Sequence, residues 1–460
     1  MRVTMRNSVV LILVFVFLAA CILTTVPASA SAEETENTWA SKASMQVARS
    51  GLGVAAVKGR IYAIGGYGEK GIIVGTNEEY DPVTDTWVFK AEMPTPRVYF
   101  ATAVYDNKIY CIGGSPKEGI TGITEVYDPA TDTWENKTSM PTARILGPAN
   151  VANGKIYLIG GLPNQTLNEE YDPATDTWTT KTPMPTAAGG ASAVFNNRIY
   201  IMGGYFNDKG GAISLTQIYD PNTDTWSLGA PPPTFFGSGS TAVTTGTIAP
   251  KRIYIFDNPY GDSTATPNDP FYTNQVYDPE TDNWTSGAEI PAKRFSFGVA
   301  AVDDLIYVIG GYTMYIDIFH IQPNGPVTTT YAANEQYTPY GYGTVPPAVN
   351  VVSLENNKTY TGKDVDLNFT VNKPVAWMGY SLDGQDNVTI AGNTTLSELP
   401  TGLHNVTVYA KDEYENTGVS ETVTFSIEVP ELFPVTMVAV VVAVAITGVI
   451  LAVYFKKRTS

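Results

Sequence analysis

Four arginines occupy matching positions in a repeated pattern, each a few residues before a run of apolar, β-prone residues. They are Arg49, Arg97, Arg144 and Arg294, and two further copies of the pattern have Ala188 and Phe236 at this place. A guanidinium group binds carboxylate or phosphate oxygens through paired hydrogen bonds. The four arginines are therefore candidate ligand-binding residues for an acidic partner. The alternative is that each arginine holds a loop or pairs with one of the 45 acidic residues of the chain.

Other residues that carry chemistry are few. The chain has two histidines, His320 and His404, and two cysteines, Cys21 and Cys111. A zinc site needs three or four clustered ligands, and a Ser-His-acid triad needs a nucleophile motif that neither histidine has beside it. We expect both histidines at the surface, and we expect no catalytic residue, no metal and no cofactor.

Two phrases recur along the chain. Tyr-Asp-Pro-x-Thr-Asp-x-Trp occurs at Tyr80–Trp87, Tyr127–Trp134, Tyr171–Trp178, Tyr219–Trp226 and Tyr277–Trp284. Ile-Tyr-x-Ile-Gly-Gly, or a near copy, ends at Gly66, Gly114, Gly161, Gly204 and Gly311. At the remaining place, Asp257-Asn258 replaces the glycine pair. The period of about 43 to 58 residues is typical of propeller repeats.

Each unit predicts one four-stranded sheet. Residues 53–57 and 61–64 are apolar and flank a turn, so they predict a buried hairpin. The glycine pair lets the backbone pass close to a neighbouring sheet, where a side chain would clash. The Asp-Pro and Thr-Asp residues predict a tight turn between two more strands, whose Tyr and Trp can pack between sheets.

These phrases resemble the kelch repeat family, whose members form β-propellers. The resemblance implies an all-β fold with a six-bladed kelch β-propeller at residues 36–343. Trp39 lies 26 residues before Gly65, the same spacing as Trp87 to Gly113, whereas the last unit has no tryptophan. We therefore expect an N-terminal strand at 37–44 to complete the last blade, which removes an open sheet edge. Kelch-family oxidases hold copper through histidines that this chain lacks.

The same resemblance places the four arginines around one mouth of the ring, where arginines of other kelch proteins often contact ligands. Aromatic residues nearby are candidate stacking surfaces for sugars or parts of the core, namely Tyr99, Phe100, Phe235, Phe236 and Phe295. We expect Phe100 in the core. Two long loops, 259–273 and 312–330, depart most from the repeat and are expected to carry recognition. Their Asp262, Asp269 and Asp317 do not have the spacing of a calcium loop.

A second domain is expected at residues 346–430, where short strands alternate polar and apolar residues. Its segment 403–425 resembles immunoglobulin-like spacer domains of prokaryotic surface proteins, which implies an Ig-like β-sandwich that serves as a stalk. Eight Asn-x-Ser/Thr sequons are glycosylation candidates or chance matches: Asn136, Asn164, Asn283, Asn357, Asn368, Asn387, Asn393 and Asn405.

Both ends of the chain carry long apolar runs. Residues 1–30 read as a signal peptide that ends in Ala28-Ser29-Ala30, and lipidation at Cys21 is the less favoured alternative. Residues 433–455 lack charge and are long enough for a transmembrane helix, and the basic tail 456–460 is expected to stay cytoplasmic. The net charge is −17, and it becomes −22 without the five basic residues of these two ends. That charge disfavours nucleic acid as a partner.

These features predict a single-pass cell-surface protein of prokaryotic type, with archaea among the candidate sources. Its expected function is binding or adhesion, in which the propeller recognises an extracellular protein or glycan, with acidic ligands among the candidates. Two alternatives stay open. One is a sugar-acting enzyme, because some kelch propellers are sialic-acid mutarotases, and the other is a structural coat component. Fold does not decide between them.

Overall fold

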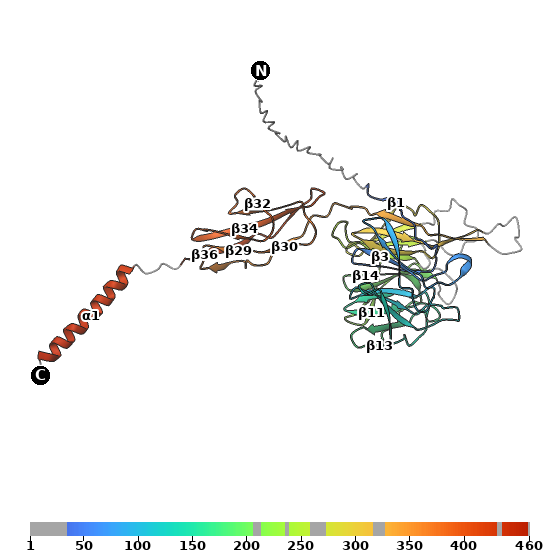
Figure 1. Ribbon diagram of the computed structural model, residues 1–460, viewed down its shortest axis with the longest axis horizontal. Helices are drawn as coiled ribbons and strands as arrows, with labels where there is room; N and C mark the ends of the chain where they lie inside the picture. The colour runs from blue at the N-terminus through green and yellow to red at the C-terminus, as the bar shows by residue number, and fades with distance from the viewer. Residues whose placement is uncertain are drawn as a thin grey trace, which may run out of the picture. The chain divides into compact units, whose positions relative to one another are not determined.

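The computed structural model describes residues 35–205, 213–234, 239–257, 273–315, 327–429 and 435–458. Several predictions fall outside these ranges. They concern the signal peptide with Cys21, the aromatic residues Phe235 and Phe236, the loop residues Asp262, Asp269 and Asp317, and His320. The described part is dominated by β-strands (Figure 1).

Six four-stranded antiparallel sheets form the first part of the described chain. In the first three, the strands pair in chain order. They consist of β2 (Gly53–Val57), β3 (Arg60–Ile64), β4 (Asn77–Asp81) and β5 (Thr86–Lys90); β6 (Ala101–Tyr105), β7 (Lys108–Ile112), β8 (Thr124–Asp128) and β9 (Thr133–Lys137); and β10 (Ala149–Ala152), β11 (Lys155–Ile159), β12 (Asn168–Asp172) and β13 (Thr177–Thr180). A short 3-10 turn, η1 (Glu69–Gly71), lies between β3 and β4.

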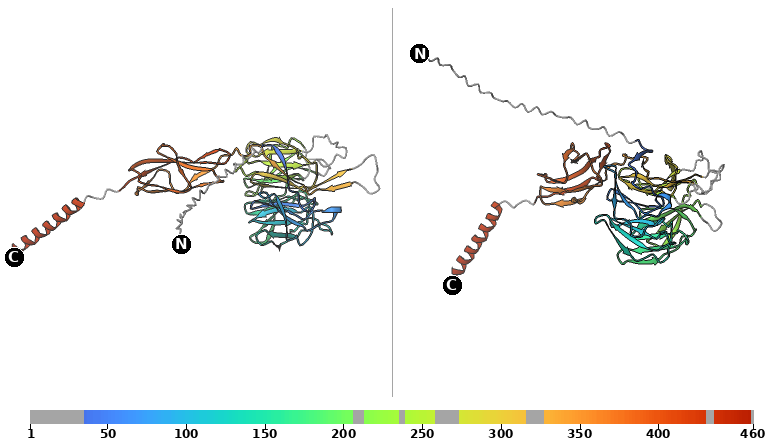
Figure 2. Two further views of the ribbon diagram at one scale, coloured as in Figure 1. Left: turned by 45° about the horizontal axis from the view of Figure 1, so that its top comes forward. Right: turned by 45° about the vertical axis from the view of Figure 1, so that its right-hand side comes forward.

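The next two sheets repeat this order, and the sixth departs from it. They consist of β14 (Gly189–Phe195), β15 (Arg198–Tyr205), β16 (Thr216–Asp220) and β17 (Thr225–Gly229); β18 (Ser240–Val243), β19 (Ile253–Asp257), β20 (Thr273–Asp278) and β21 (Asn283–Gly287); and β22 (Gly298–Val302), β23 (Leu305–Ile309), β26 (Asn334–Thr338) and β1 (Thr38–Lys42). A separate hairpin, β24 (Tyr312–Tyr315) with β25 (Val327–Thr330), projects from the sixth sheet (Figure 2).

The six sheets are the blades of a β-propeller. Their first strands contact one another in the cyclic order β2, β6, β10, β14, β18, β22 and back to β2. Six buried apolar clusters each draw side chains from two consecutive blades. The core is therefore six interfaces between blades, which explains why the first three strands of each blade are rich in buried apolar residues.

The Tyr and Trp of the repeated phrase lie opposite each other on the third and fourth strands of a blade. Tyr80 pairs with Trp87 in the register of β4 and β5, and their ring centroids are 4.9 Å apart. The Tyr80 hydroxyl donates to Oδ1 of Asp85 in the turn at 2.7 Å. The same oxygen accepts the backbone N–H of Ala43 at 2.8 Å, so the turn also ties neighbouring blades together.

The last blade is completed by the strand nearest the N-terminus. β1 pairs antiparallel with β26, and Figure 1 shows β1, in blue, beside the yellow and orange strands. Asn37 has φ 58° and takes the place of the turn aspartate, because its Oδ1 accepts from the Tyr337 hydroxyl and from Ala288 N–H. The Trp39 indole donates to the Ala288 carbonyl at 3.1 Å, as Trp87 donates to Ala43.

A second β region follows at residues 349–427. Its strands are β27 (Val349–Val351), β28 (Lys358–Tyr360), β29 (Val365–Leu367), β30 (Phe369–Val371), β31 (Trp377–Leu382), β32 (Val388–Ile390), β33 (Thr394–Leu396), β34 (Gly402–Lys411), β35 (Thr417–Val419) and β36 (Val423–Ile427). One large sheet has the order β28-β36-β34-β31-β32 with β35 on β34, and two small sheets pair β27 with β30 and β29 with β33. The Ig-like assignment of this region stays a prediction.

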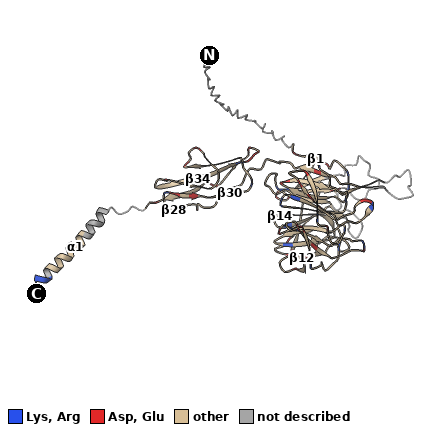
Figure 3. Ribbon diagram, in the orientation of Figure 1, with Lys and Arg blue, Asp and Glu red and all other residues tan. Residues whose placement is uncertain are grey.

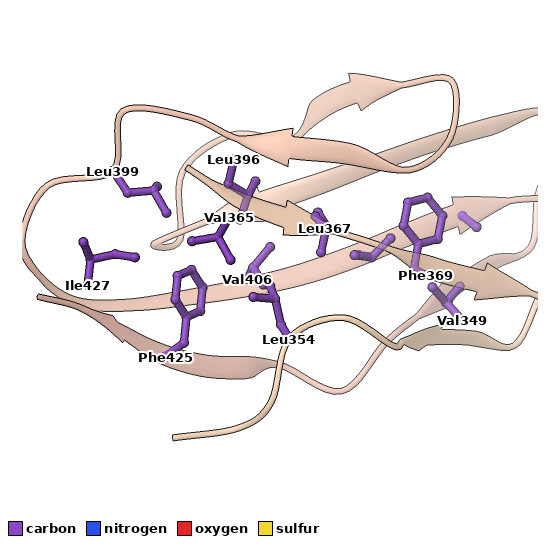
Figure 4. Close-up of a cluster of buried hydrophobic side chains, with 12 residues drawn as sticks. Val349, Leu354, Val365, Leu367, Phe369, Leu396, Leu399, Val406, Phe425 and Ile427 are labelled. Atoms are coloured by element: carbon purple, nitrogen blue, oxygen red, sulfur yellow. The ribbon is translucent and has the colours of Figure 1, made fainter. Parts of the chain in front are cut away.

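This region has its own core. Val365 and Leu367 of β29 and Phe369 of β30 point toward Val406 of β34 and Phe425 of β36 (Figure 4). The prediction of a surface position for His404 is wrong, because this side chain is only 3% exposed. Its two ring nitrogens lie 2.8 Å from Asp383 Oδ2 and 2.8 Å from the Pro400 carbonyl oxygen, and these contacts hold it inside.

A helix, α1 (Val435–Arg458), ends the described chain, and its last turn carries Lys456, Lys457 and Arg458 (Figure 3). A search of the described residues finds no helix that is both long and apolar enough to cross a membrane. The transmembrane helix at 433–455 therefore stays a prediction, and its first two residues lie outside the described ranges.

Candidate binding site at the propeller mouth

The four predicted arginines are buried, with exposed fractions of 0 to 1%. Arg49 Nη2 lies 2.9 Å from Glu78 Oε1 on β4 of the same blade, and Nη1 donates to the Thr76 carbonyl at 2.6 Å and to the Gly65 carbonyl at 3.2 Å. Burial lowers the pKa of Arg49 to about 10, which leaves it charged at neutral pH. A guanidinium group held in this way does not face solvent.

The same ion pair recurs in three other blades. It joins Arg97 to Glu125, Arg144 to Glu169 and Arg294 to Glu335. The two blades that lack the arginine also lack the acid, because they have Gln217 and Gln275 at its place. Gln217 replaces the ion pair with hydrogen bonds, accepting from Thr186 N–H at 2.9 Å and donating to its carbonyl at 3.0 Å. Arginine and glutamate therefore change together within the chain.

The backbones of Arg49, Arg97 and Arg144 also join two blades. The carbonyl of Arg49 accepts a hydrogen bond from Gly311 N–H of the preceding blade at 2.8 Å, and the Arg97 carbonyl accepts from Gly66 in the same way. A Cβ on Gly310 would lie 2.5 Å from the Arg49 oxygen, and Gly310 has φ 70°. Both facts require glycine there. Because these arginines are buried and paired within the blades, the prediction that they contact a ligand is corrected. They hold the glycine pair and the interface between blades in place, as the alternative interpretation proposed.

A cavity of about 620 Å³ opens where the arginine-containing segments meet around the axis. Four residues line it at matching places, two positions after each arginine. They are Gly51, Tyr99, Leu146 and Ser296, with φ between 52° and 61°. This left-handed conformation is unfavourable for Tyr99 and Leu146, at a cost of about 1–3 kcal/mol each.

Hydrogen bonds between blades hold these residues in place. Gly51 N–H donates to the Ser296 carbonyl at 2.8 Å, Tyr99 N–H to the Gly51 carbonyl at 3.0 Å, and Leu146 N–H to the Tyr99 carbonyl at 3.0 Å. A continuous run of backbone hydrogen bonds thus follows the mouth over four consecutive blades. Strained residues kept by their surroundings are typical of functional sites.

The lining combines aromatic rings with hydroxyl groups. Tyr99 packs against Tyr67 with ring centroids 5.8 Å apart, and Phe295 packs against Tyr312 at 5.6 Å. Leu146 is 38% exposed. Hydroxyl groups come from Ser192, Ser240, Thr241, Thr102 and Ser296. A second cavity of about 420 Å³ shares part of this wall and is lined by alanine, valine and threonine of four inner strands.

The described lining carries one charged side chain. Among the described residues that line the mouth, none is Lys or Arg, and the one charged residue is Asp257. Asp257 is 6% exposed and stands at the place of the first glycine of the pair. The arrangement offers apolar faces and hydrogen-bonding groups without a cation, which suits a neutral, hydroxyl-rich ligand.

Sequence reasoning identified part of this lining. Tyr99, Phe100 and Phe295 line the mouth, and Phe100, which is 8% exposed, also belongs to the core between the first two blades, as predicted. Leu146 was missed, although its offset from Arg144 matches that of Tyr99 from Arg97. In the sequence, Asp257 stands out only because it replaces a glycine of the repeat, and this replacement was the one indication of a place in the lining.

Seven of the eight sequon asparagines are exposed, and Asn368 is half-buried. Asn393 Oδ1 accepts the Phe369 N–H at 2.9 Å, so its side chain is already engaged. Glycosylation of these residues stays a prediction. A search of the described residues for three or more clustered His, Cys, Asp or Glu side chains finds no such group.

Comparison with known proteins identifies kelch motifs in this chain. The sequence model of the Kelch motif matches residues 48–94, 96–141 and 187–233. Halomucin of Haloquadratum walsbyi is 40% identical over 91 residues, which is 18% of this chain and 1% of halomucin. The chain thus spans a very small part of that relative. The solved structure titled "Structure of YjhT" aligns with 62% of this chain and 99% of its own, at a TM-score of 0.48 and 15% identity.

Proposed function

We propose that this chain, a β-propeller built from kelch motifs, is a binding module that recognises a neutral glycan at the propeller mouth. The observation that carries the proposal is the cavity of about 620 Å³ with half-buried aromatic rings and several hydroxyl groups. Aromatic faces stack on the apolar faces of sugars, and serine and threonine hydroxyls exchange hydrogen bonds with sugar hydroxyls.

The rigidity of the mouth supports binding. Its strained residues are fixed by backbone hydrogen bonds between blades, four blades are fixed in turn by a buried ion pair, and the blade of Gln217 is fixed by the hydrogen bonds of that residue. A lining fixed before the ligand arrives loses little conformational entropy on binding. An extracellular protein segment with a similar hydroxyl-rich surface is the other partner that this lining accommodates.

We place this activity at the cell surface as part of the same proposal. The apolar run 433–455 with the basic residues after it supports a C-terminal membrane anchor, and the apolar run near Met1 supports export. The acidic surface and the exposed sequons suit an extracellular location. Protease treatment of intact cells tests this placement, because a displayed propeller is cleaved or shed and an internal one is protected.

A glycan array with purified full-length protein tests the binding function. We compare the wild type with Tyr99→Asn, because asparagine tolerates the left-handed conformation and removes the ring. The matched control is Phe89→Ala, which removes a 55% exposed ring from β5, outside the mouth. One lost stacking contact of about 1 kcal/mol predicts roughly fivefold weaker binding of neutral glycans by Tyr99→Asn. Absence of neutral glycan binding, or an equal loss in the control, contradicts the proposal.

Asp257 favours a second candidate, a sugar-acting enzyme that interconverts anomers. Opening of a sugar ring needs a group that moves a proton between the anomeric hydroxyl and the ring oxygen, and one carboxylate can do this in both directions. Asp257 is the carboxylate of the described lining. Exchange NMR of anomer interconversion tests the idea: acceleration by the wild type and its loss in Asp257→Asn support the enzyme, and equal rates with and without protein exclude it for the sugars used.

A further inference from the structure

One inner-strand position differs in a single blade. Asn150 on β10 lies opposite Tyr157 of β11. The residue opposite the matching tyrosine is alanine in every other blade, namely Ala55, Ala103, Ala193, Ala242 and Ala300. All six side chains are buried, and Asn150 is 4% exposed. Alanine therefore satisfies the packing of this position, and the fold by itself does not require an asparagine.

The amide of Asn150 is paired at one end only. Its Oδ1 accepts the Ser192 hydroxyl of the next blade at 2.9 Å. Its Nδ2 is buried and has no partner among the described residues. Turning the amide over would leave the oxygen unpaired instead, so either orientation leaves one polar atom without a hydrogen bond. Burial of an unpaired donor lowers stability.

Four other unpaired buried atoms follow the repeat. They are Oδ1 atoms of asparagines at one repeated position on the third strands, namely Asn77, Asn168, Asn274 and Asn334. Each of these asparagines donates through Nδ2 to a backbone carbonyl near the next strand. They are a recurring feature of the blades. Asn150 occurs once, and a destabilising residue that occurs once at a site is a candidate for function.

The position of Asn150 connects it to the mouth. Asn150 is not among the residues that line the cavity, but its neighbour Ala149 and its partner Ser192 are, so its buried amide lies behind the lining. On this side the repeat also departs from its pattern in two other ways, because Ala188 replaces the arginine and Asp257 replaces a glycine. Asn150, Ala188 and Asp257 thus lie in three consecutive blades, the third to the fifth.

We propose that Asn150 and Ser192 form a polar subsite that binds an oxygen atom of a neutral sugar through the Asn150 amide. Nδ2–H donates to a hydroxyl or ring oxygen of the ligand, and this bond supplies the partner that the protein does not provide. The Ser192 hydroxyl keeps the amide oriented by donating to Oδ1. The subsite rests on the proposed glycan-binding function and locates its hydrogen-bonding wall between β10 and β14.

The test is Asn150→Ala, which installs the residue of the other five blades. The control is Phe89→Ala, which removes an exposed side chain from β5, outside the mouth. Full-length proteins are compared by thermal unfolding and by saturation-transfer NMR with the methyl glycosides of glucose, galactose and mannose.

We expect Asn150→Ala to unfold at the same or a higher temperature than the wild type and to bind these glycosides roughly tenfold more weakly. Phe89→Ala should keep wild-type binding. If the wild type binds and Asn150→Ala binds equally well, the subsite is refuted while the proposed function stands. A clear drop in the unfolding temperature of Asn150→Ala also refutes it, because the amide would then have a structural partner. If no glycoside binds the wild type, the proposed function fails and the subsite with it.

Discussion

Replacement of Arg49 by alanine separates the structural role of the arginines from a ligand-binding role. The change leaves Glu78 buried at 0% exposure without its cation. Removing one partner of a buried ion pair destabilises a protein by about 3–5 kcal/mol. Arg49 also donates to the carbonyls of Thr76 and Gly65, and each lost hydrogen bond adds about 1 kcal/mol or less. We expect Arg49→Ala to lower the free energy of unfolding by about 4 kcal/mol.

The fourth blade supplies the compensating change. It has Ala188 and Gln217 where the first has Arg49 and Glu78. The double variant Arg49→Ala/Glu78→Gln reproduces this pair and removes the unpaired charge. We expect it to recover about half of the lost free energy or more, and to keep a deficit of about 1–2 kcal/mol for the lost hydrogen bonds.

The assay is urea unfolding of the full-length proteins, followed by far-UV circular dichroism. The control is Arg60→Ala in the same blade, whose ion pair with Asp81 is partly exposed. We expect this control to cost less than about 1 kcal/mol. A deficit of that size for Arg49→Ala, or a double variant no more stable than the single, would refute the reasoning.

Three further predictions concern ring closure and pH. Asn37→Ala removes the acceptor for Tyr337 and Ala288, so we expect a lower unfolding temperature. Asn37→Asp places an aspartate there, as in the other turns, and should keep the wild-type unfolding temperature. Equal unfolding temperatures for the two variants would contradict the role of Asn37 in closing the ring of blades. The Tyr80 hydroxyl donates to Asp85 and lowers its pKa, so this carboxylate stabilises the fold above pH 4 and loses its effect as the pH falls through the folded-state pKa. In Asp85→Asn, the free energy of unfolding should depend less on pH in the acidic range than in the wild type. An unchanged dependence on pH would contradict this role of Asp85. Burial lowers the pKa of His404, but the hydrogen bonds to Pro400 and Asp383 outweigh burial and raise this pKa. The protonated histidine therefore stabilises the fold below pH 6.5, and this stabilisation is lost as the pH rises through the folded-state pKa. The stability of the second β region at pH 6 and pH 8 should differ less in His404→Gln than in the wild type.

The blade architecture could be predicted because one phrase contains a complete hairpin. Tyr80 and Trp87 are seven residues apart in the sequence and face each other across β4 and β5. The glycine pair could also be interpreted, since a close approach of the backbone explains why it recurs in five of the six repeats. Local spacing carries this information, and no long-range contact has to be guessed.

The arginine partners lie farther away and could not be located in the same manner. Glu78 is 29 residues from Arg49 and on the third strand, so the ion pair depends on the folded blade. One signal was present in the sequence. Gln217 and Gln275 replace the acid in the same two units that lack the arginine. That parallel change favours pairing within a blade over a shared ligand.

The mouth was the least predictable part. Sequence offers no reason to place Tyr99 or Leu146 in the left-handed region, which side chains of this size rarely adopt. Their conformation depends on hydrogen bonds between residues of different blades. Asn150 could not be predicted for the same reason. The strand register is needed to see that the other five blades have alanine at its place, and the folded structure is needed to see that its Nδ2 has no partner among the described residues.

A crystal structure of the full-length protein with a bound neutral methyl glycoside tests the central claim most directly. The account predicts a sugar ring in the cavity beside Tyr99 and Leu146, with one of its oxygens within hydrogen-bond distance of Asn150 Nδ2. A sugar bound elsewhere on the propeller, with the mouth empty at saturating ligand, would contradict it.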